Sequence, residues 1–486
     1  MTSHFGFDII NPKNIIVLKG TAFIQKTLRK GKRKMKITAN FDNITGKIKP
    51  MHAVGQPPLY SFDSGMFHYI TEANIPYSRL HDMGGAYGRN LYVDIPNLFR
   101  DFDADETKEE NYDFTFTDVL LEDMFKAGME PFFRLGVTIE NAYNIKAYRI
   151  YPPKDFAKWA RICEHVIRHY NEGWANGYKY GIKYWEIWNE PEGEANDAGG
   201  AMWLGTKAQF MEFYEVASKH LKSCFGDSIM VGGPAAIGFG INAYKRDTDL
   251  CGIRPKDGVY KDNHDWWLDY IHDFLAYCRD HKCPLDFFSW HSYWPLENTL
   301  EHADHCQKLL DKYGFGSIEH ILNEWNTCEH KREDHDSGIP SSKTLAMMLG
   351  MQKKTTAMLC FYDARCGIGN YSGMFNPDTK LPRKNYYAFR TFGRMYKYQN
   401  EVETFSDDKD VYVGGATDGR RAVLAISNPS DRQLVCELDL CGVDAVDVDI
   451  LTTDANTLYT DCGRKIVDGK ITLAPWSCTE IRFDKI

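Results

Sequence analysis

Short apolar runs alternate with longer segments of helical periodicity between about residue 46 and residue 395. Each run is almost continuously apolar, as expected for a strand of a parallel sheet that is buried on both faces. The runs predict eight strands, at residues 47–55, 75–82, 129–136, 184–190, 228–234, 285–293, 320–326 and 357–363.

The segments between these runs predict amphipathic helices. In residues 156–170 the apolar side chains recur at steps of three and four, which places them on one face of a helix. Residues 210–221 and 267–278 carry a similar stripe. Eight alternating strand and helix units predict an α/β fold, the (β/α)8 TIM barrel, and about 350 residues suit that fold when its loops are long.

Three connections that follow predicted strands are long, at residues 83–113, 137–154 and 235–263. In a TIM barrel the connection after a strand lies on the C-terminal face, where active sites are built. We therefore expect these three loops to shape a pocket or a lid.

Both ends of the chain alternate apolar and polar residues with period two, at residues 8–45 and about 400–486. Turn signals such as Thr417-Asp418-Gly419 separate the predicted strands. Neither end alone carries enough apolar residues for a core, so we expect both to join in one accessory β-sandwich domain. The predicted division is 1–45 for the N-terminal β segment, 46–395 for the barrel and 396–486 for the C-terminal β-sandwich.

Composition narrows the classes of partner. With 43% apolar and 14% aromatic residues, the 486-residue chain can bury a large core. The balance of 58 basic and 67 acidic residues is spread along the chain, which disfavours nucleic acid and anionic membranes as partners. No apolar run has the length needed to span a bilayer.

The cysteines and histidines give expectations about compartment and cofactors. The thirteen cysteines form no CxxC pair, and the first residues do not read as an export signal. We expect reduced thiols and a cytoplasmic protein, with a removed signal as the alternative. The sixteen histidines show no HExxH or similar spacing, so we expect no metal and no cofactor.

Two predicted strands end in an acid with asparagine and tryptophan beside it, in KYWEIWNEP (183–191) and HILNEWNT (320–327). These motifs place Glu190 and Glu324 at the carboxyl ends of the fourth and seventh strands, so both would face the same opening of the predicted barrel. Surface acids are the alternative, which the concentration of polar and aromatic neighbours disfavours. Two carboxylates at one bond suit glycosidic cleavage, because one protonates the leaving oxygen and the other stabilises or attacks the anomeric carbon.

These motifs, with DFFSWHSY (286–293) and GMFNPDTKLPRKNYYAFRTF (373–392), resemble glycoside hydrolase family 39, which includes β-xylosidases and α-L-iduronidases. The landmarks stand in the same order between about residues 46 and 395, and the β-rich flanks fit the family architecture. The family lies in the retaining clan with the acid/base on strand four and the nucleophile on strand seven. The resemblance implies a retaining exo-glycoside hydrolase that acts by double displacement, most similar to a β-xylosidase acting on plant-derived oligosaccharides.

Residue roles follow from the resemblance position by position. Glu190 is the implied general acid/base and Glu324 the implied nucleophile. Asn189 is expected to hold the sugar 2-hydroxyl, a contact that strengthens in the transition state. Arg79 and Tyr293 are the candidates that keep the nucleophile ionised.

Several neighbours allow two interpretations. His81 and His291 end strands two and six, either as structural residues or as contacts to sugar hydroxyls or a carboxylate. Trp294 is our first choice for the pocket wall. Trp325 is a second aromatic candidate, with core packing as its alternative. Arg134 replaces an expected acid at the end of strand three, where it would suit recognition of a substrate carboxylate.

Substrate choice stays open at this stage. α-L-Iduronidase-like, galactosidase and arabinosidase activities are alternatives, and so is a carbohydrate-binding protein without catalysis. The expected partners are an oligosaccharide or glycoside and, from the resemblance, further copies of the same chain in a homo-oligomer.

Overall fold

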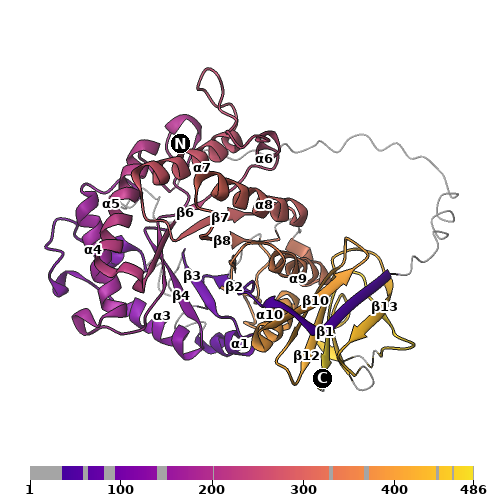
Figure 1. The fold of residues 1–486 in the computed structure, drawn as a ribbon. Helices are drawn as coiled ribbons and strands as arrows, with labels where there is room; N and C mark the ends of the chain where they lie inside the picture. The colour runs from indigo at the N-terminus through magenta and orange to yellow at the C-terminus, as the bar shows by residue number, and fades with distance from the viewer. Residues whose placement is uncertain are drawn as a thin grey trace, which may run out of the picture. The chain divides into compact units, whose positions relative to one another are not determined.

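The structure is a computed structural model of the 486-residue chain. It describes residues 35–58, 64–81, 93–138, 150–200, 202–327, 332–365, 371–444, 448–461, 463 and 465–484. These residues build a closed barrel of eight parallel strands and a separate nine-stranded sheet (Figure 1).

The barrel strands follow one another in sequence order and pair in parallel around the ring, which confirms the predicted TIM barrel. Seven of them lie within or close to the predicted ranges. The first is shorter than predicted, because residues up to Lys47 belong to a strand of the other sheet. The barrel strands are β2 (Ala53–Gly55), β3 (Tyr77–Leu80), β4 (Glu130–Leu135), β5 (Tyr184–Ile187), β6 (Met230–Ala236), β7 (Phe287–Ser292), β8 (Glu319–Trp325) and β9 (Met358–Phe361).

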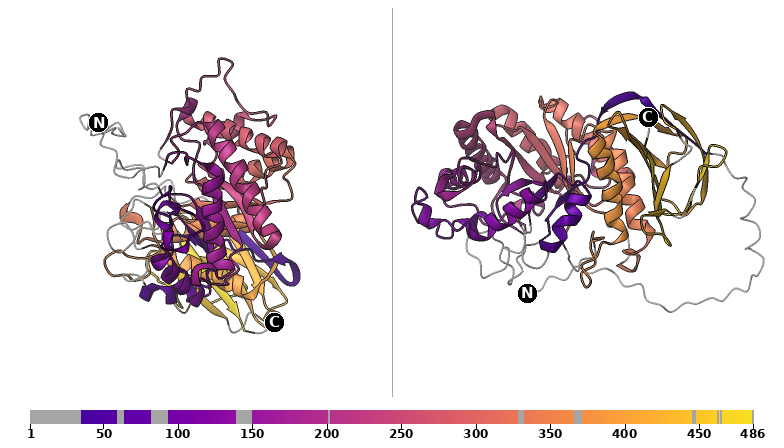
Figure 2. Two further views of the ribbon diagram at one scale, coloured as in Figure 1. Left: turned by 90° about the vertical axis from the view of Figure 1, so that its left-hand side faces the viewer. Right: turned by 90° about the horizontal axis from the view of Figure 1, so that it is seen from below.

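Helices cover the outside of the barrel (Figures 1 and 2). Local signals set their starts: Asp155 accepts the Lys158 N–H at the start of α4, and Thr206 and Gln209 form a capping box at the start of α5. The α-helices of the described residues are α1 (Phe67–Glu72), α2 (Ile95–Leu98), α3 (Thr115–Lys126), α4 (Phe156–Asn171), α5 (Lys207–Phe225), α6 (Ala243–Arg246), α7 (Asn263–His281), α8 (Leu296–Tyr313), α9 (Gly338–Gln352) and α10 (Lys384–Tyr398). None of these helices has the length and hydropathy of a membrane span.

The inside of the barrel is apolar at one level and polar at the next. A cluster that includes Phe132, Tyr184 and Ile321 fills the barrel at the level of these residues. Side chains two positions further along a strand point to the same face. Arg134 and Glu186 therefore lie one level nearer the carboxyl ends of the strands, where the polar site is built.

Both ends of the described chain contribute to the second sheet, as predicted. β1 lies between an antiparallel neighbour, β10, and a parallel neighbour, β13. The strands, in chain order, are β1 (Met35–Lys47), β10 (Asn400–Ser406), β11 (Tyr412–Thr417), β12 (Ala422–Asn428), β13 (Leu434–Cys441), β14 (Asp449–Thr453), β15 (Thr460–Asp461), β16 (Lys470–Leu473) and β17 (Ser477–Phe483). Predicted strands before residue 35 lie outside the described residues.

The strands expected in a sandwich belong to one continuous sheet, in the order β15-β14-β17-β12-β11-β10-β1-β13-β16. Ile37, Leu424, Ile471 and Ile481 come from different parts of this sheet and share one hydrophobic core. The sheet therefore encloses its core as two packed layers would.

Two barrel helices, α9 and α10, pack against β11, β12 and β17. Ser427 Oγ donates to Ser342 O over 2.6 Å, and Arg394 Nε lies 2.7 Å from the buried Glu480 Oε1.

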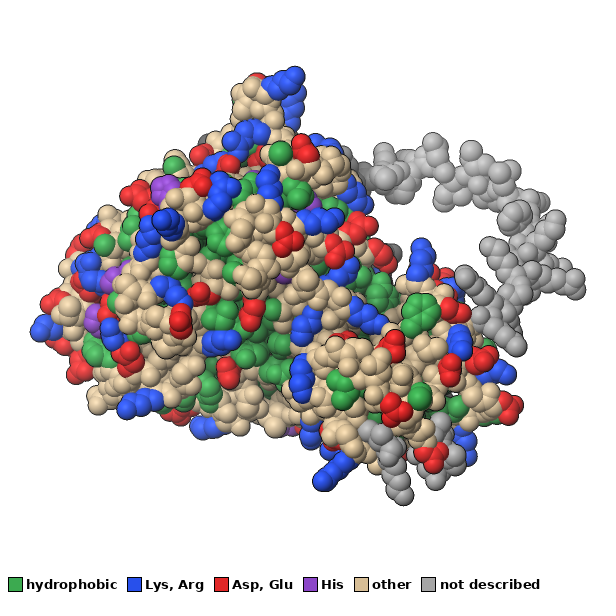
Figure 3. Space-filling view, viewed as in Figure 1, with side chains coloured by type: hydrophobic (Ala, Val, Ile, Leu, Met, Phe, Trp, Pro, Cys, Tyr) green, Lys and Arg blue, Asp and Glu red, His purple; other side chains and the backbone are tan. Residues whose placement is uncertain are grey.

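On the face shown in Figure 3, acidic and basic side chains are interspersed, as the sequence predicts.

A substitution at Gly393 tests the close packing of α10 against the backbone at the end of α1. A Cβ at this position would lie 1.8 Å from the backbone oxygen of Ala73, which ends α1. Gly393→Ala is expected to lower the free energy of unfolding by at least about 2 kcal/mol, since backbone cannot move aside as a side chain can. The control, Gly350→Ala in α9, meets the flexible end of Leu300 at 3.0 Å and is expected to cost less. Urea unfolding of both variants measures the difference, and equal losses would contradict this packing.

Candidate active site

The two acids lie at the carboxyl ends of β5 and β8. Glu324 is the penultimate residue of strand β8 and is paired in register with His291 of β7. Glu190 lies in the turn after β5, where Trp188 and Glu190 both have positive φ, 71° and 43°. Such conformations cost about 1–3 kcal/mol each for residues other than glycine.

Neighbouring strands hold this strained turn. Trp188 N donates to Leu135 O and Glu190 N donates to Ala235 O, each over 2.9 Å. The acceptors belong to β4 and β6, on either side of β5. The backbone of the barrel therefore fixes the direction in which the Glu190 side chain leaves the strand.

The imidazole of His291 lies between the two acids. Its Nδ1 is 2.7 Å from Glu190 Oε1, and its Nε2 is 3.7 Å from Glu324 Oε2. One oxygen of each acid and a ring nitrogen all lie within 4.8 Å of one another. His291 thus contacts carboxylates, as one of its two interpretations required.

Arg79 and Tyr293 hold the two oxygens of Glu324. Arg79 Nη1 lies 3.1 Å from Oε2, and the Tyr293 hydroxyl donates to Oε1 over 2.5 Å. Burial and the nearby charge of Glu324 raise the pKa of Tyr293 well above its usual value. The phenol therefore stays protonated and remains a donor.

A third acid, Glu186, completes the site and was missed in the sequence. Its Oε2 lies 2.7 Å from Arg79 Nε, and its Oε1 accepts from Asn323 Nδ2 over 2.5 Å. Arg79 Nη2 also donates to Asn189 Oδ1 over 2.6 Å. An acid inside an apolar strand, two residues after the inward-facing Tyr184, is the signal that pointed to it.

The opposing charges set the protonation of Arg79. Burial disfavours its charged form, but the charges of Glu186 and Glu324 outweigh burial and raise its pKa further. Burial and the charge of Arg79 hold the pKa of the adjacent His81 well below its usual value. His81 is therefore neutral beside the guanidinium.

The two candidate tryptophans occupy different environments. Trp294 is partly exposed, and its Nε1 donates to Phe239 O over 2.9 Å, which ties it to the loop after β6. Trp325 is fully buried, with its ring 5.1 Å from that of Phe361 in the main hydrophobic core. Trp325 is a core residue and does not line a pocket, because its side chain points away from the acids.

Arg134 is already paired with a carboxylate of the protein. Its Nη2 lies 2.7 Å from Asp94 Oδ1, and both side chains are fully buried. The other oxygen of Asp94 accepts from the backbone and hydroxyl of Thr138, over 3.0 and 3.1 Å. The structure does not support the interpretation of Arg134 as a binding group for a substrate carboxylate.

Two groups of side chains in the described ranges have the donor types and spacing for a metal ion. One consists of Glu190, His291 and Glu324, where the guanidinium of Arg79 opposes a second cation. The other, Glu164, His220 and Cys224, lies on α4 and α5.

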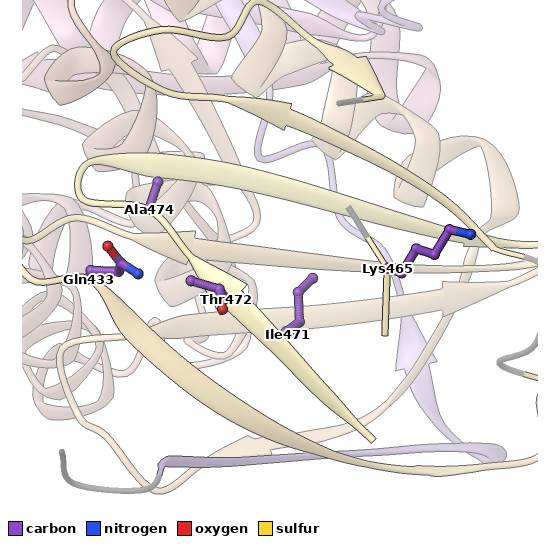
Figure 4. Close-up of a pocket in the computed structure, with 5 residues that line it drawn as sticks. All are labelled: Gln433, Lys465, Ile471, Thr472 and Ala474. Carbon is purple, nitrogen blue, oxygen red and sulfur yellow. The ribbon is translucent and has the colours of Figure 1, made fainter. Parts of the chain in front are cut away.

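A pocket of about 350 Å³ lies beside β16 in the nine-stranded sheet (Figure 4). Its lining residues are Gln433, Lys465, Ile471, Thr472 and Ala474. This lining offers no acid for hydrolysis and no aromatic ring on which a sugar would stack. The pocket therefore takes no part in the chemistry of the two acids.

Comparisons with known proteins indicate similarity to glycoside hydrolases. Residues 87–309 match the family model described as Glycosyl hydrolases family 39. A β-xylosidase from Geobacillus stearothermophilus is 26% identical over 272 residues, 49% of this chain and 46% of that protein. The match thus spans about half the length of this relative.

Solved structures share the fold over most of the chain. A glucosidase from Croceicoccus marinus is 19% identical, with a TM-score of 0.69 over 93% of this chain and 99% of that one. A monomeric β-xylosidase from Caulobacter crescentus is 15% identical, with a TM-score of 0.64 over the same shares. The family match assigns residues 87–309 to family 39 of the glycosyl hydrolases, and most of the chain shares the fold of the solved structures.

Proposed function

We propose that this protein is a retaining exo-glycoside hydrolase, with Glu190 as general acid/base and Glu324 as nucleophile. The observation that carries the proposal is the approach of the two acids, whose oxygens come within 4.8 Å with His291 between them. Retaining enzymes keep their carboxyl groups about 5–5.5 Å apart, whereas inverting enzymes need about 6.5–9.5 Å to admit a water. The short separation favours double displacement.

In the first step Glu324 attacks the anomeric carbon while Glu190 gives its proton to the leaving oxygen, and a glycosyl-enzyme ester forms. Arg79 and Tyr293 orient the attacking carboxylate through its two oxygens. In the second step Glu190 takes a proton from water, which breaks the ester and releases the sugar with its original configuration. His291 fixes the orientation of the Glu190 carboxyl group in both steps.

We propose β-xylosides as the substrates. The relative named a β-xylosidase supports this choice. The second support is that two arginines near the site already form ion pairs with carboxylates of the protein. Arg134 is paired with Asp94, and Arg365 Nε lies 3.2 Å from Asp363 Oδ2. Since these cations already have carboxylate partners, a neutral sugar suits the site better than a uronide.

The loop after Glu190 is hydrogen-bonded to the loop after β6 and to α7 (Asn263–His281). Glu192 Oε1 accepts from Ile237 N over 2.9 Å, and Trp266 Nε1 donates to Glu192 O over 2.7 Å. Trp267 Nε1 donates to Gly193 O over 3.0 Å. These bonds hold the loop after Glu190 in place, and they support the assignment of Glu190 as a proton donor held in one position.

Replacement of either acid is the first test. Glu190→Ala and Glu324→Ala are expected to lower the hydrolysis rate of a nitrophenyl β-xyloside by about 1,000-fold or more. The Glu190→Ala loss should shrink with a dinitrophenyl leaving group, which needs less protonation. Glu212→Ala, which removes an exposed acid of α5, is the control and should leave the rate unchanged.

Proton NMR of the wild-type reaction should show the β-anomer of xylose first. Full turnover in Glu324→Ala, or the α-anomer as first product, would refute the assignment.

A substrate panel separates the alternatives. Among aryl β-xyloside, β-galactoside, α-L-arabinofuranoside and α-L-iduronide, the xyloside is expected to give the highest kcat/KM. Fastest hydrolysis of the iduronide would overturn the argument from the paired cations. Binding across the panel without hydrolysis would favour a carbohydrate-binding protein.

Tyr293→Phe tests the orientation of the nucleophile. The change removes one charge-assisted hydrogen bond to Glu324 and keeps the ring. Such a bond contributes about 1.5–3 kcal/mol, so kcat/KM should fall by about 10- to 100-fold. Tyr151→Phe, at an exposed tyrosine, should have no effect. Equal activity of Tyr293→Phe and wild type would show that the hydroxyl does not orient Glu324.

Glu192 gives a pH-dependent test of the fastened loop. Burial, with a smaller effect of the Glu190 charge, raises the pKa of Glu192 well above its usual value. The stability that comes from keeping this acid neutral is present below its unfolded pKa and is lost as pH rises toward its folded pKa. Glu192→Gln keeps the acceptor for Ile237 N, so its stability relative to wild type should increase with pH.

The increase should reach at most about 1.4 kcal/mol per pH unit above the ordinary Glu titration range. Urea unfolding from about pH 4 to pH 8 measures it. Glu194→Gln, at the exposed acid two residues on, is the matched control and should show no such trend. A pH-independent difference for Glu192→Gln would contradict a neutral buried carboxyl.

A further inference from the structure

Helices α4 and α5 lie side by side on the outside of the barrel (Figure 1). Three side chains of types that bind metal ions come together on these two helices. His220 and Cys224 are four residues apart on α5, so they lie on one face one turn apart. Glu164 approaches them from α4. His220 Nε2 lies 2.7 Å from Glu164 Oε2 and 3.7 Å from Cys224 Sγ.

We propose that Glu164, His220 and Cys224 bind a divalent transition-metal ion, with Zn²⁺ as the ion that fits best, and that water supplies the fourth ligand. Thiolate, imidazole and carboxylate are the three ligand types that Zn²⁺ takes in proteins. The role is separate from the hydrolysis of glycosides, because none of the three belongs to the active site.

The distances suit a tetrahedral site. Zn–S and Zn–N bonds of about 2.3 and 2.0 Å at the tetrahedral angle place sulfur and nitrogen about 3.5 Å apart. Cys224 Sγ and His220 Nε2 are 3.7 Å apart. The Glu164 oxygen has to withdraw from its hydrogen bond with His220 by about 0.6 Å to reach the spacing of two ligands. Its side chain is partly exposed, which leaves room for that movement.

Arg168 orients the carboxylate for this role. Its Nε lies 2.8 Å from Glu164 Oε1, which leaves Oε2 directed at His220. Arg168 also pairs with Glu172, so its charge is shared between two carboxylates. Outer partners of this kind fix the geometry of metal ligands in proteins.

Metal binding would change the protonation of the thiol. Burial, followed by the charge of Glu164, raises the pKa of Cys224. A thiol that is protonated without metal must lose its proton to coordinate, so each ion bound displaces the Cys224 proton into solvent. The bound ion would join α4 and α5, the helices before and after β5, and would stiffen the support of the strand that leads to Glu190.

The test uses the full chain and a thiolate-specific signal. Co²⁺ titration is expected to give a thiolate-to-metal charge-transfer band that saturates at one equivalent, and Zn²⁺ should abolish the band by competition. The active-site group of Glu190, His291 and Glu324 contains no sulfur, so metal bound there gives no such band. The result is therefore independent of whether the proposed hydrolase activity is found.

Cys224→Ser should remove the band, and Cys224→Ser and His220→Gln should each weaken Zn²⁺ binding in calorimetry by at least about 100-fold. Cys251→Ser, at an exposed cysteine outside both groups, is the matched control and should bind as wild type. Circular dichroism of each variant establishes that it is folded. A band that survives in Cys224→Ser, no band in the wild type, or Zn²⁺ binding only at millimolar concentration would overturn the proposal.

Discussion

The site depends on the ion pairs that the buried guanidinium of Arg79 makes with Glu186 and Glu324. A charge inside a barrel costs several kcal/mol unless it is paired and hydrogen-bonded. Arg79 meets this requirement through Glu186, Glu324 and Asn189, which come from β5, β8 and the turn after β5. The contacts that offset the desolvation cost of Arg79 also connect Glu324 on β8 with Asn189 in the turn after β5. Removing Arg79 would take from Glu186 and Glu324 the cation that they share.

The barrel brings these groups together by simple geometry. Tyr184 and Phe132 fill the level below, so the next inward positions on the strands have to hold the polar groups. There each cation acquires a protein carboxylate, Glu186 for Arg79 and Asp94 for Arg134. Glu324 is held by the same guanidinium but keeps some exposure to the mouth. This difference separates an acid that supports the site from one that can reach a substrate.

The sequence was sufficient for the elements whose pattern is local. Continuous apolar runs predicted the barrel, and the motifs around Glu190 and Glu324 predicted which strands carry the acids. The partners of Arg134 were beyond sequence reasoning, because Asp94 lies 40 residues away in a loop. Trp325 was ambiguous for a related reason: adjacent residues on a strand face opposite sides, and only the register of β8 shows which side is the core.

The turn after β5 connects strain with function. Positive φ at Trp188 and Glu190 persists because β4 and β6 supply backbone acceptors and because Glu192 fastens the following loop. Burying Glu192 as a neutral acid weakens the fold as pH rises, yet it places a carbonyl-like acceptor where the Ile237 N–H needs one. The molecule thus accepts two local costs at one turn. Both arise where hydrogen bonds to β4 and β6 hold the backbone of Trp188 and Glu190, which places the Glu190 carboxyl group close to that of Glu324.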